Sequence, residues 1–258
     1  IALSQWTGLK IEALVVAMTL LMATAAARST RIYDPTANLW TYLATMIGLT
    51  IAPGAMFAER EHYAAIAAVP VAAALMATAN GQQLSRTRRI IAGACAALIV
   101  AFKPPFAAGI AIPAAYSLYR RRSLAWISPA EVISCLAFLA AYVGVSYLAY
   151  PAYFTDALPE AIRLYSAAHA SIEMGLTSEA MWFGAAISLS AVFVAFSTTL
   201  SRVATGAALS AFGFMIAGLA QQKYQINHAS AAVALATIPL IEASFSGRIT
   251  NLIAKAVI

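Results

Sequence analysis

Residues 59–80 read EREHYAAIAAVPVAAALMATAN, in which four titratable side chains precede an almost unbroken apolar run. A helix of about 20 predominantly apolar residues is long enough to cross a bilayer. Such runs recur along the chain: 62% of its 258 residues are hydrophobic, 10% are charged, and the mean hydropathy is +0.79. An ordinary soluble domain has roughly 45–50% apolar and 25% charged residues. The composition therefore excludes a soluble globular fold and predicts an all-α, polytopic transmembrane helix bundle.

Apolar runs between charged clusters predict about nine membrane spans in this chain. The fourth and fifth are short, and Lys103-Pro104-Pro105 between them must interrupt a helix because proline lacks a backbone N–H. We therefore expect these two segments to form a re-entrant or broken pair. The predicted spans are residues 11–27, 38–55, 63–80, 89–103, 106–119, 131–150, 181–200, 203–220 and 228–245.

The charged residues divide unequally between alternate loops. One side carries eleven of the sixteen basic residues and three acids, whereas the other carries five basic and seven acidic residues. Because cytoplasmic loops are enriched in Lys and Arg, the first side is predicted to be cytoplasmic and the second to be the outer face. The cytoplasmic set is Arg28, Arg31, Arg86, Arg88, Arg89, Arg120, Arg121, Arg122, Arg202, Arg248 and Lys255, with Asp34, Glu131 and Glu242.

This partition predicts a single transmembrane domain over residues 1–258. Residues 1–10 fall on the outer side, so a chain that starts in the cytoplasm would need another span and a first outer loop upstream of Ile1.

The one long connector, residues 151–180, is also predicted to be an outer-face loop. In it Pro159 stands at a helix start, with Leu158 and Ile162 at helical spacing, which predicts a short amphipathic helix lying in the interface. On the cytoplasmic side, Asp34-Pro35 has the pattern of a helix N-cap followed by proline at the first helical position.

Several partner classes are not expected. The basic residues punctuate apolar runs and do not line a patch with aromatic side chains, so nucleic acid is not predicted as a partner. Cys95 and Cys135 lie inside apolar runs without zinc-type spacing, so no metal site is predicted. The arginine runs at 86–89 and 120–122 are expected to anchor the topology at anionic membrane lipid, with a specific lipid site as the alternative.

The run Glu59-Arg60-Glu61-His62 opens the third predicted span on the outer side. Ionisable groups at a membrane are costly, so each is a functional candidate until a structural role accounts for it. Within one turn this run could supply a general base, a cation for phosphate and a hydrogen-bonding imidazole. The alternative is that the two acids only cap the helix and pair with the arginine. Capping needs one acid, so we favour the functional interpretation.

Two more polar groups on the outer side are candidates. Lys103 ends an apolar run beside two prolines, so it either snorkels to the interface or lines a cavity where the backbone is open. The outer connector contributes Tyr153, among residues that we expect to be mainly solvated.

The fourth group is the string QQKYQINH at residues 221–228, which contains Lys223, Tyr224 and His228. Its donors suit sugar hydroxyls or a phosphate, although an ordinary polar loop has a similar composition. Because all four groups fall on one side, we expect polar loops to converge there over a membrane-embedded site.

These segments resemble a family of polytopic bacterial membrane proteins in which the corresponding stretches read roughly Gln-Arg-Glu-His, Lys-Pro-His, Tyr-Phe with Leu-Pro, and Gln-Gly-Lys-Gly-aromatic followed by Tyr-His. That family is similar to the GT-C class of glycosyltransferases, which take a sugar from a polyprenyl-phosphate carrier. The matching segments here are Glu59-Arg60-Glu61-His62, Lys103-Pro104-Pro105-Phe106, Tyr153-Phe154 with Leu158-Pro159 and Tyr165, and Gln222-Lys223-Tyr224 with His228. This chain departs at Glu59, Pro105, Gln222 and Gln225.

The resemblance implies sugar transfer from a lipid phosphate to an acceptor on the periplasmic or extracellular face of the bacterial inner membrane, for cell-envelope or exopolysaccharide assembly. A carboxylate, either Glu61 or one upstream of Ile1, would deprotonate the acceptor, with Glu59 as a second catalytic candidate. The substrate-binding residues would be Arg60, His62, Lys103, Tyr153, Lys223, Tyr224 and His228. No cofactor is required, and use of a divalent cation is the alternative. The lipid-linked sugar and membrane lipid are the expected partners.

Two other functions remain open at this point. A transporter or flippase would use the broken helix pair and the outer cations to bind an anionic or lipid-linked substrate. A non-catalytic subunit would use the outer loops to bind other membrane subunits.

Overall fold

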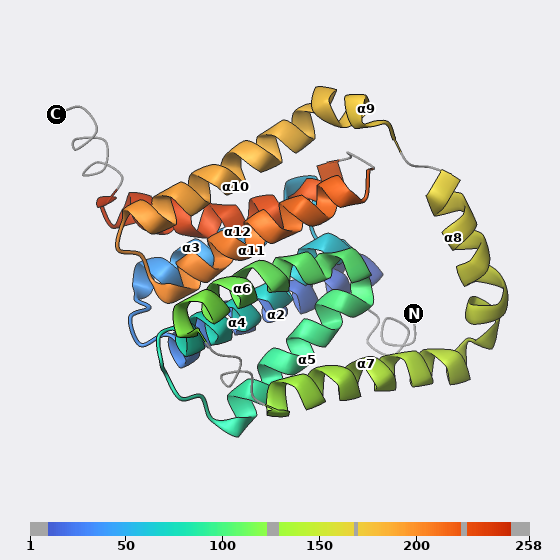
Figure 1. Ribbon diagram of the computed structural model, residues 1–258, viewed down its shortest axis with the longest axis horizontal. Helices are drawn as coiled ribbons and strands as arrows, with labels where there is room; N and C mark the ends of the chain where they lie inside the picture. Colours follow the sequence, from blue (N-terminus) through green and yellow to red (C-terminus); the bar gives the residue numbers. More distant parts are fainter. Residues whose placement is uncertain (1–9, 123–128, 168–169, 223–225, 249–258) are drawn as a thin grey trace.

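The computed structural model describes residues 10–122, 129–167, 170–222 and 226–248, and these residues form eleven α-helices and no strand (Figure 1). The helices are α2 (Ile11–Tyr33), α3 (Leu39–Thr50), α4 (Arg60–Ala79), α5 (Arg86–Phe102), α6 (Ala108–Arg121), α7 (Pro129–Ala149), α8 (Leu158–Ala167), α9 (Ile172–Thr177), α10 (Glu179–Ser197), α11 (Arg202–Ala220) and α12 (Ile226–Phe245).

Helix α4 is the centre of the bundle. Its most apolar window is 89% buried, against α2, α5, α6, α11 and α12. Most of its side chains are those of alanine and valine, and small residues let neighbouring backbones approach closely. Helices α6 and α11 approach in the same way, since any side chain at Gly213 would collide with the backbone of Ala108.

A helix forms at each of the nine predicted spans, but within the described ranges only six helices are long and apolar enough to cross a membrane. These six are α2, α4, α7, α10, α11 and α12. Helices α3, α5 and α6 have 12, 17 and 14 residues, so nine full spans are not confirmed. The predicted break at Lys103 is confirmed, because the 3-10 turn Pro104–Ala107 joins α5 to α6 there.

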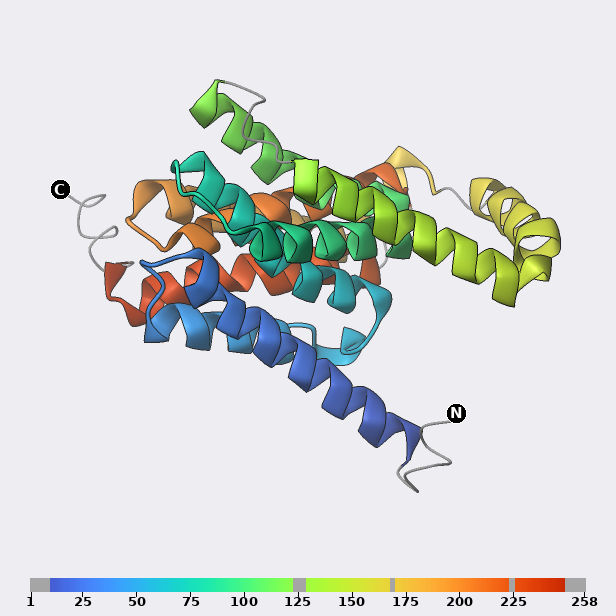
Figure 2. The same cartoon turned by 90° about the horizontal axis from the view of Figure 1, so that it is seen from below.

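Helices α7 and α8 leave the bundle as an arm (Figures 1 and 2). Helix α7 packs on α5, yet only 6% of its apolar window is buried. A π-helical turn, Tyr153–Ala157, then redirects the chain into α8, which lies across one end of the bundle in Figure 1. A helix therefore forms where the amphipathic segment was predicted, and its location at a membrane interface stays a prediction.

The contacts between loops sort the bundle into two ends. At one end, here called the Glu61 end, Glu61 pairs with Lys103. At the same end the backbone N–H of Ala170 donates to the carbonyl of Gln222 at 2.8 Å. The other end, here called the Asp34 end, holds the contact of the Asp34 carboxylate with the backbone N–H of Arg202 at 2.7 Å. Each of these contacts joins segments that the charge pattern assigns to the same side.

Candidate functional site

The Glu61 end is built around an ion pair between α4 and the end of α5. The Lys103 ammonium donates to the Glu61 carboxylate. The two side chains are 11% and 1% exposed, so both charges are largely withdrawn from water. A buried charge is costly unless it is paired, which makes this contact a requirement of the local fold. The pair brings together two of the four predicted groups from 42 positions apart in the chain.

Phenylalanine rings extend this cluster toward α11. The Lys103 ammonium lies 5.4 Å from the centre of the Phe106 ring, within the range of a cation–π contact. Phe106 packs edge-on against Phe214 of α11, with 5.3 Å between ring centres. Sequence reasoning did not give Phe106 a role, because an apolar residue after two prolines carries no sign of what it will contact.

His62 is fully buried and both of its ring nitrogens contact the backbone. Nε2 lies 2.6 Å from the carbonyl of Leu49, and Nδ1 accepts the N–H of Ala58 at 2.9 Å. Ala58 has a positive φ of 65°, a conformation that costs most side chains roughly 1–2 kcal/mol. His62 thus ties a strained loop to the end of α3, and its predicted contact with substrate stays a prediction.

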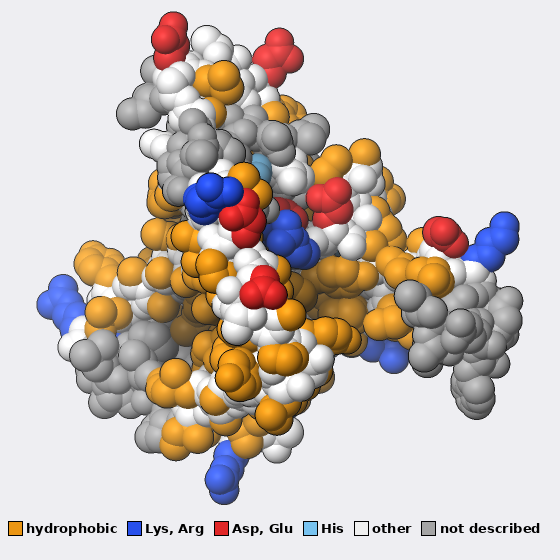
Figure 3. Space-filling model, turned by 90° about the vertical axis from the view of Figure 1, so that its right-hand side faces the viewer, with side chains coloured by type: hydrophobic (Ala, Val, Ile, Leu, Met, Phe, Trp, Pro, Cys, Tyr) orange, Lys and Arg blue, Asp and Glu red, His pale blue; other side chains and the backbone are white. Residues whose placement is uncertain are grey.

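Glu59 and Arg60 are the exposed members of the same run. Glu59 occupies the N-cap position of α4, but its side chain makes no capping hydrogen bond. Among the described ion pairs, Glu61 pairs with Lys103 and not with Arg60. The simple capping alternative therefore does not describe this cluster, and Glu59 and Arg60 are placed where a ligand could reach them. Figure 3 faces this end and shows acidic and basic side chains gathered near its centre, beside hydrophobic ones.

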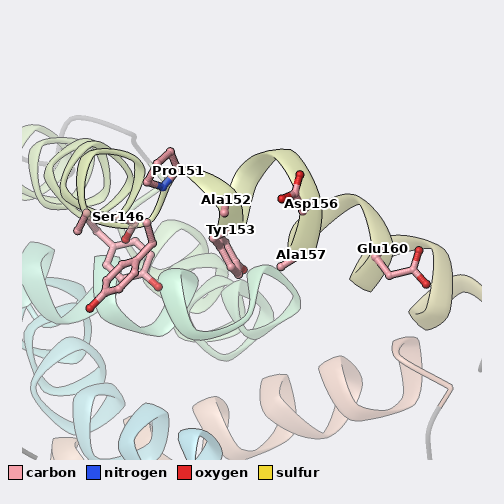
Figure 4. Close-up of a pocket in the computed structure, with 10 residues that line it drawn as sticks. Ser146, Pro151, Ala152, Tyr153, Asp156, Ala157 and Glu160 are labelled. Atoms are coloured by element: carbon pink, nitrogen blue, oxygen red, sulfur yellow. The ribbon is translucent and has the colours of Figure 1, made fainter.

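Tyr153 lines a separate, open groove of about 1080 Å³ where α7 turns into α8 (Figure 4). The groove wall is mostly apolar, with Ser146, Asp156 and Glu160 as polar members. In Figure 4 Tyr153 and Asp156 project from opposite sides of the π-helical turn. Neither Glu61 nor Lys103 lines this groove, so the groove and the ion pair are distinct features of the same end.

The loop before α12 is described only in part, and the predicted residues Lys223 and Tyr224 lie outside the described residues. Gln222 adopts a positive φ of 50°, the backbone conformation that glycine adopts without strain. This is one of the positions where the resembling family has glycine. His228 is buried at the start of α12, whose backbone packs closely on Gly218 of α11.

At the Asp34 end, two buried carboxylates hold the start of α11. Asp34 accepts the backbone N–H groups of Arg202 and Val203, at 2.7 and 3.3 Å. Glu242 accepts the N–H and the hydroxyl of Ser201, at 2.8 and 2.7 Å. The prediction that Asp34 caps the helix after it is wrong: Asn38 caps α3, and Asp34 serves a helix far along the chain. Sequence reasoning missed this role because the partners are distant in sequence.

Among the described residues, no group of three or more His, Cys, Asp or Glu side chains is placed to hold a metal ion. Comparisons with protein-family models, with curated proteins and with solved structures returned no match.

Proposed function

We propose that this protein transfers a sugar from a polyprenyl-phosphate carrier to an acceptor at the Glu61 end, which faces the outside of the cell. The observation that supports this most directly is the buried Glu61–Lys103 pair, since it joins two segments of the family-like pattern at one end of an apolar bundle. A cation held by Glu61, the chain neighbour of exposed Arg60, suits a substrate whose reacting group is a phosphate ester.

In this proposal the ion pair positions a phosphate-binding cation. Lys103 and Arg60 neutralise the phosphate that leaves as its bond to the anomeric carbon breaks. The acceptor oxygen forms the new bond and gives its proton to a carboxylate. Glu61 is buried against Lys103 and orients it, so exposed Glu59 is the described carboxylate best placed to receive the proton.

The test is turnover by the purified full-length protein in lipid nanodiscs. A panel of polyprenyl-phosphate sugars is supplied, and release of polyprenyl phosphate is measured with and without acceptor glycans. We expect one donor to be consumed. The double variant Glu61→Gln/Lys103→Gln should bind that donor at least tenfold more weakly and turn it over at least tenfold more slowly.

The matched control is Arg163→Gln, which removes one cation from the exposed Glu160–Arg163 pair on α8 at the same end. It should leave turnover unchanged. If the protein neither binds nor turns over any donor in the panel, the enzyme proposal is refuted. Vectorial movement of the intact lipid-linked sugar without bond cleavage would favour the flippase.

A further inference from the structure

We infer that the Asp34 end carries a specific site for an anionic phospholipid, between α4, α5, α6 and α7. The site is independent of the proposed sugar transfer and lies at the opposite end of the bundle. Its two parts are an apolar cavity for an acyl chain and an arginine rim for the phosphate.

The cavity has a volume of about 270 Å³ and an almost wholly apolar wall. Each of the four helices contributes to it, through side chains such as Leu75, Ala92, Ala114 and Leu136. The partly open wall includes α7, most of whose apolar surface is exposed in the bundle. A hydrocarbon chain in the surrounding bilayer could therefore enter from the side, whereas a free phosphate ion has no reason to occupy an apolar space.

The rim is cationic where the helix faces that line the cavity continue beyond it. Arg121 follows the wall residue Ala114 by two helical turns, and its guanidinium lies over Gly81, just beyond the end of α4. Ser117, between them, donates its hydroxyl to the carbonyl of the wall residue Leu75 at 3.1 Å, which fixes this face of α6 on α4.

One acid also faces the cavity, and its charge is offset. Glu131 lies 3.8 Å from the Arg89 guanidinium, which in addition donates to the carbonyl of Leu84 at 3.1 Å. Arg121 then remains as a rim cation, and the exposed side chains of Arg86 and Arg120 add positive charge at the same end. Basic pockets between transmembrane helices on the cytoplasmic side bind anionic headgroups, and a planar guanidinium matches a phosphate in two hydrogen bonds.

The test is native mass spectrometry of the detergent-purified full-length protein, titrated with phosphatidylglycerol and with phosphatidylcholine of the same chain length. We expect the wild-type protein to retain phosphatidylglycerol preferentially. Arg121→Gln should weaken that binding about fivefold and leave phosphatidylcholine unaffected. The matched control is Arg28→Gln, which removes one exposed cation at the same end but from α2.

A second pair of variants tests the cavity. Ala114→Leu fills it and should lower retention of both lipids at least threefold, whereas Ala115→Leu, at the exposed neighbouring position, should not. If Ala114→Leu does not fold, Val132→Phe on α7 fills the same space. Equal losses from Arg121→Gln and Arg28→Gln, or unchanged retention in the folded filling variant, would overturn the inference.

Discussion

The Glu61–Lys103 pair is the residue-scale feature on which the Glu61 end depends. Removing one partner of a buried pair leaves an uncompensated charge, which costs several kcal/mol, whereas replacing both by apolar groups is often nearly neutral. The pair is buried enough for this rule to apply, with the lysine side chain 11% exposed and the glutamate 1%.

We therefore expect Lys103→Met to lower the free energy of unfolding by about 3 kcal/mol, and Glu61→Met/Lys103→Met to recover most of that loss. Unfolding in a mixed-micelle titration of the single and double variants measures the coupling. Additive losses in the double variant would show that the two side chains do not act as a pair.

Gln222 offers a second residue-scale prediction, because its positive φ strains any side chain larger than that of glycine. Gln222→Gly should raise the free energy of unfolding by about 0.5–1 kcal/mol.

The neighbouring substitution Gln221→Gly is its control. Gln221 has a φ of −76° and donates to the carbonyl of Ala217 at 3.0 Å, so glycine there should destabilise by a similar amount. Thermal unfolding compares the two variants, and the prediction is wrong if both lower the melting temperature.

At the scale of single elements, helix α11 begins under the control of two other segments. Its first N–H groups lack partners within the helix, as in any helix, and Asp34 and Glu242 accept hydrogen bonds from this turn. Both carboxylates are buried, with 0% and 1% exposed. The start of α11 is therefore a tertiary junction, and its stability reports on α2 and α12 as well.

Glu242→Ala should destabilise the protein by about 2 kcal/mol, because it leaves the buried N–H and hydroxyl of Ser201 without their acceptor. Hydrogen exchange should rise first at residues 201–204. The comparison variant is Glu160→Ala on α8, whose pair with Arg163 is exposed and should contribute only a few tenths of a kcal/mol. Similar exchange in both variants would contradict this account.

How far the sequence predicts these elements depends on the range of the interactions involved. All nine apolar segments form helices because hydrophobic runs and prolines act locally, as at Lys103-Pro104-Pro105. Helix α3 is shorter than its predicted segment, with 12 residues over Leu39–Thr50 where residues 38–55 were predicted, since composition alone does not say where a helix ends in a turn. Charge alone predicts that the four polar groups share one side, whereas the pairing of Glu61 with Lys103 and of Asp34 with α11 depends on packing across the bundle.

For the whole molecule, the two ends should face opposite sides of a membrane. The contacts that join loops agree with the charge partition, and the arginine-rich end is expected to be cytoplasmic.

This orientation predicts the labelling of single cysteines placed in a variant without Cys95 and Cys135. A cysteine at Glu160 should react with a membrane-impermeant maleimide added outside spheroplasts, and one at Arg86 should react only after the membrane is opened. Both positions are exposed in the bundle, so access to reagent is not limited by folding. Labelling of both from outside would rule out the orientation.

The junction of Asp34 with α11 also has a consequence for biosynthesis. Its two partner segments are separated by 168 positions, so the ribosome makes the first long before the second. Until then Thr36 donates its N–H and hydroxyl to one oxygen of the Asp34 carboxylate. The other oxygen has no N–H groups of α11 to accept from, and burying it without them would be costly. The turn between α2 and α3 should therefore stay hydrated at the membrane surface while the middle of the chain is inserted. A nascent chain stalled before residue 201 would be caught in that open state.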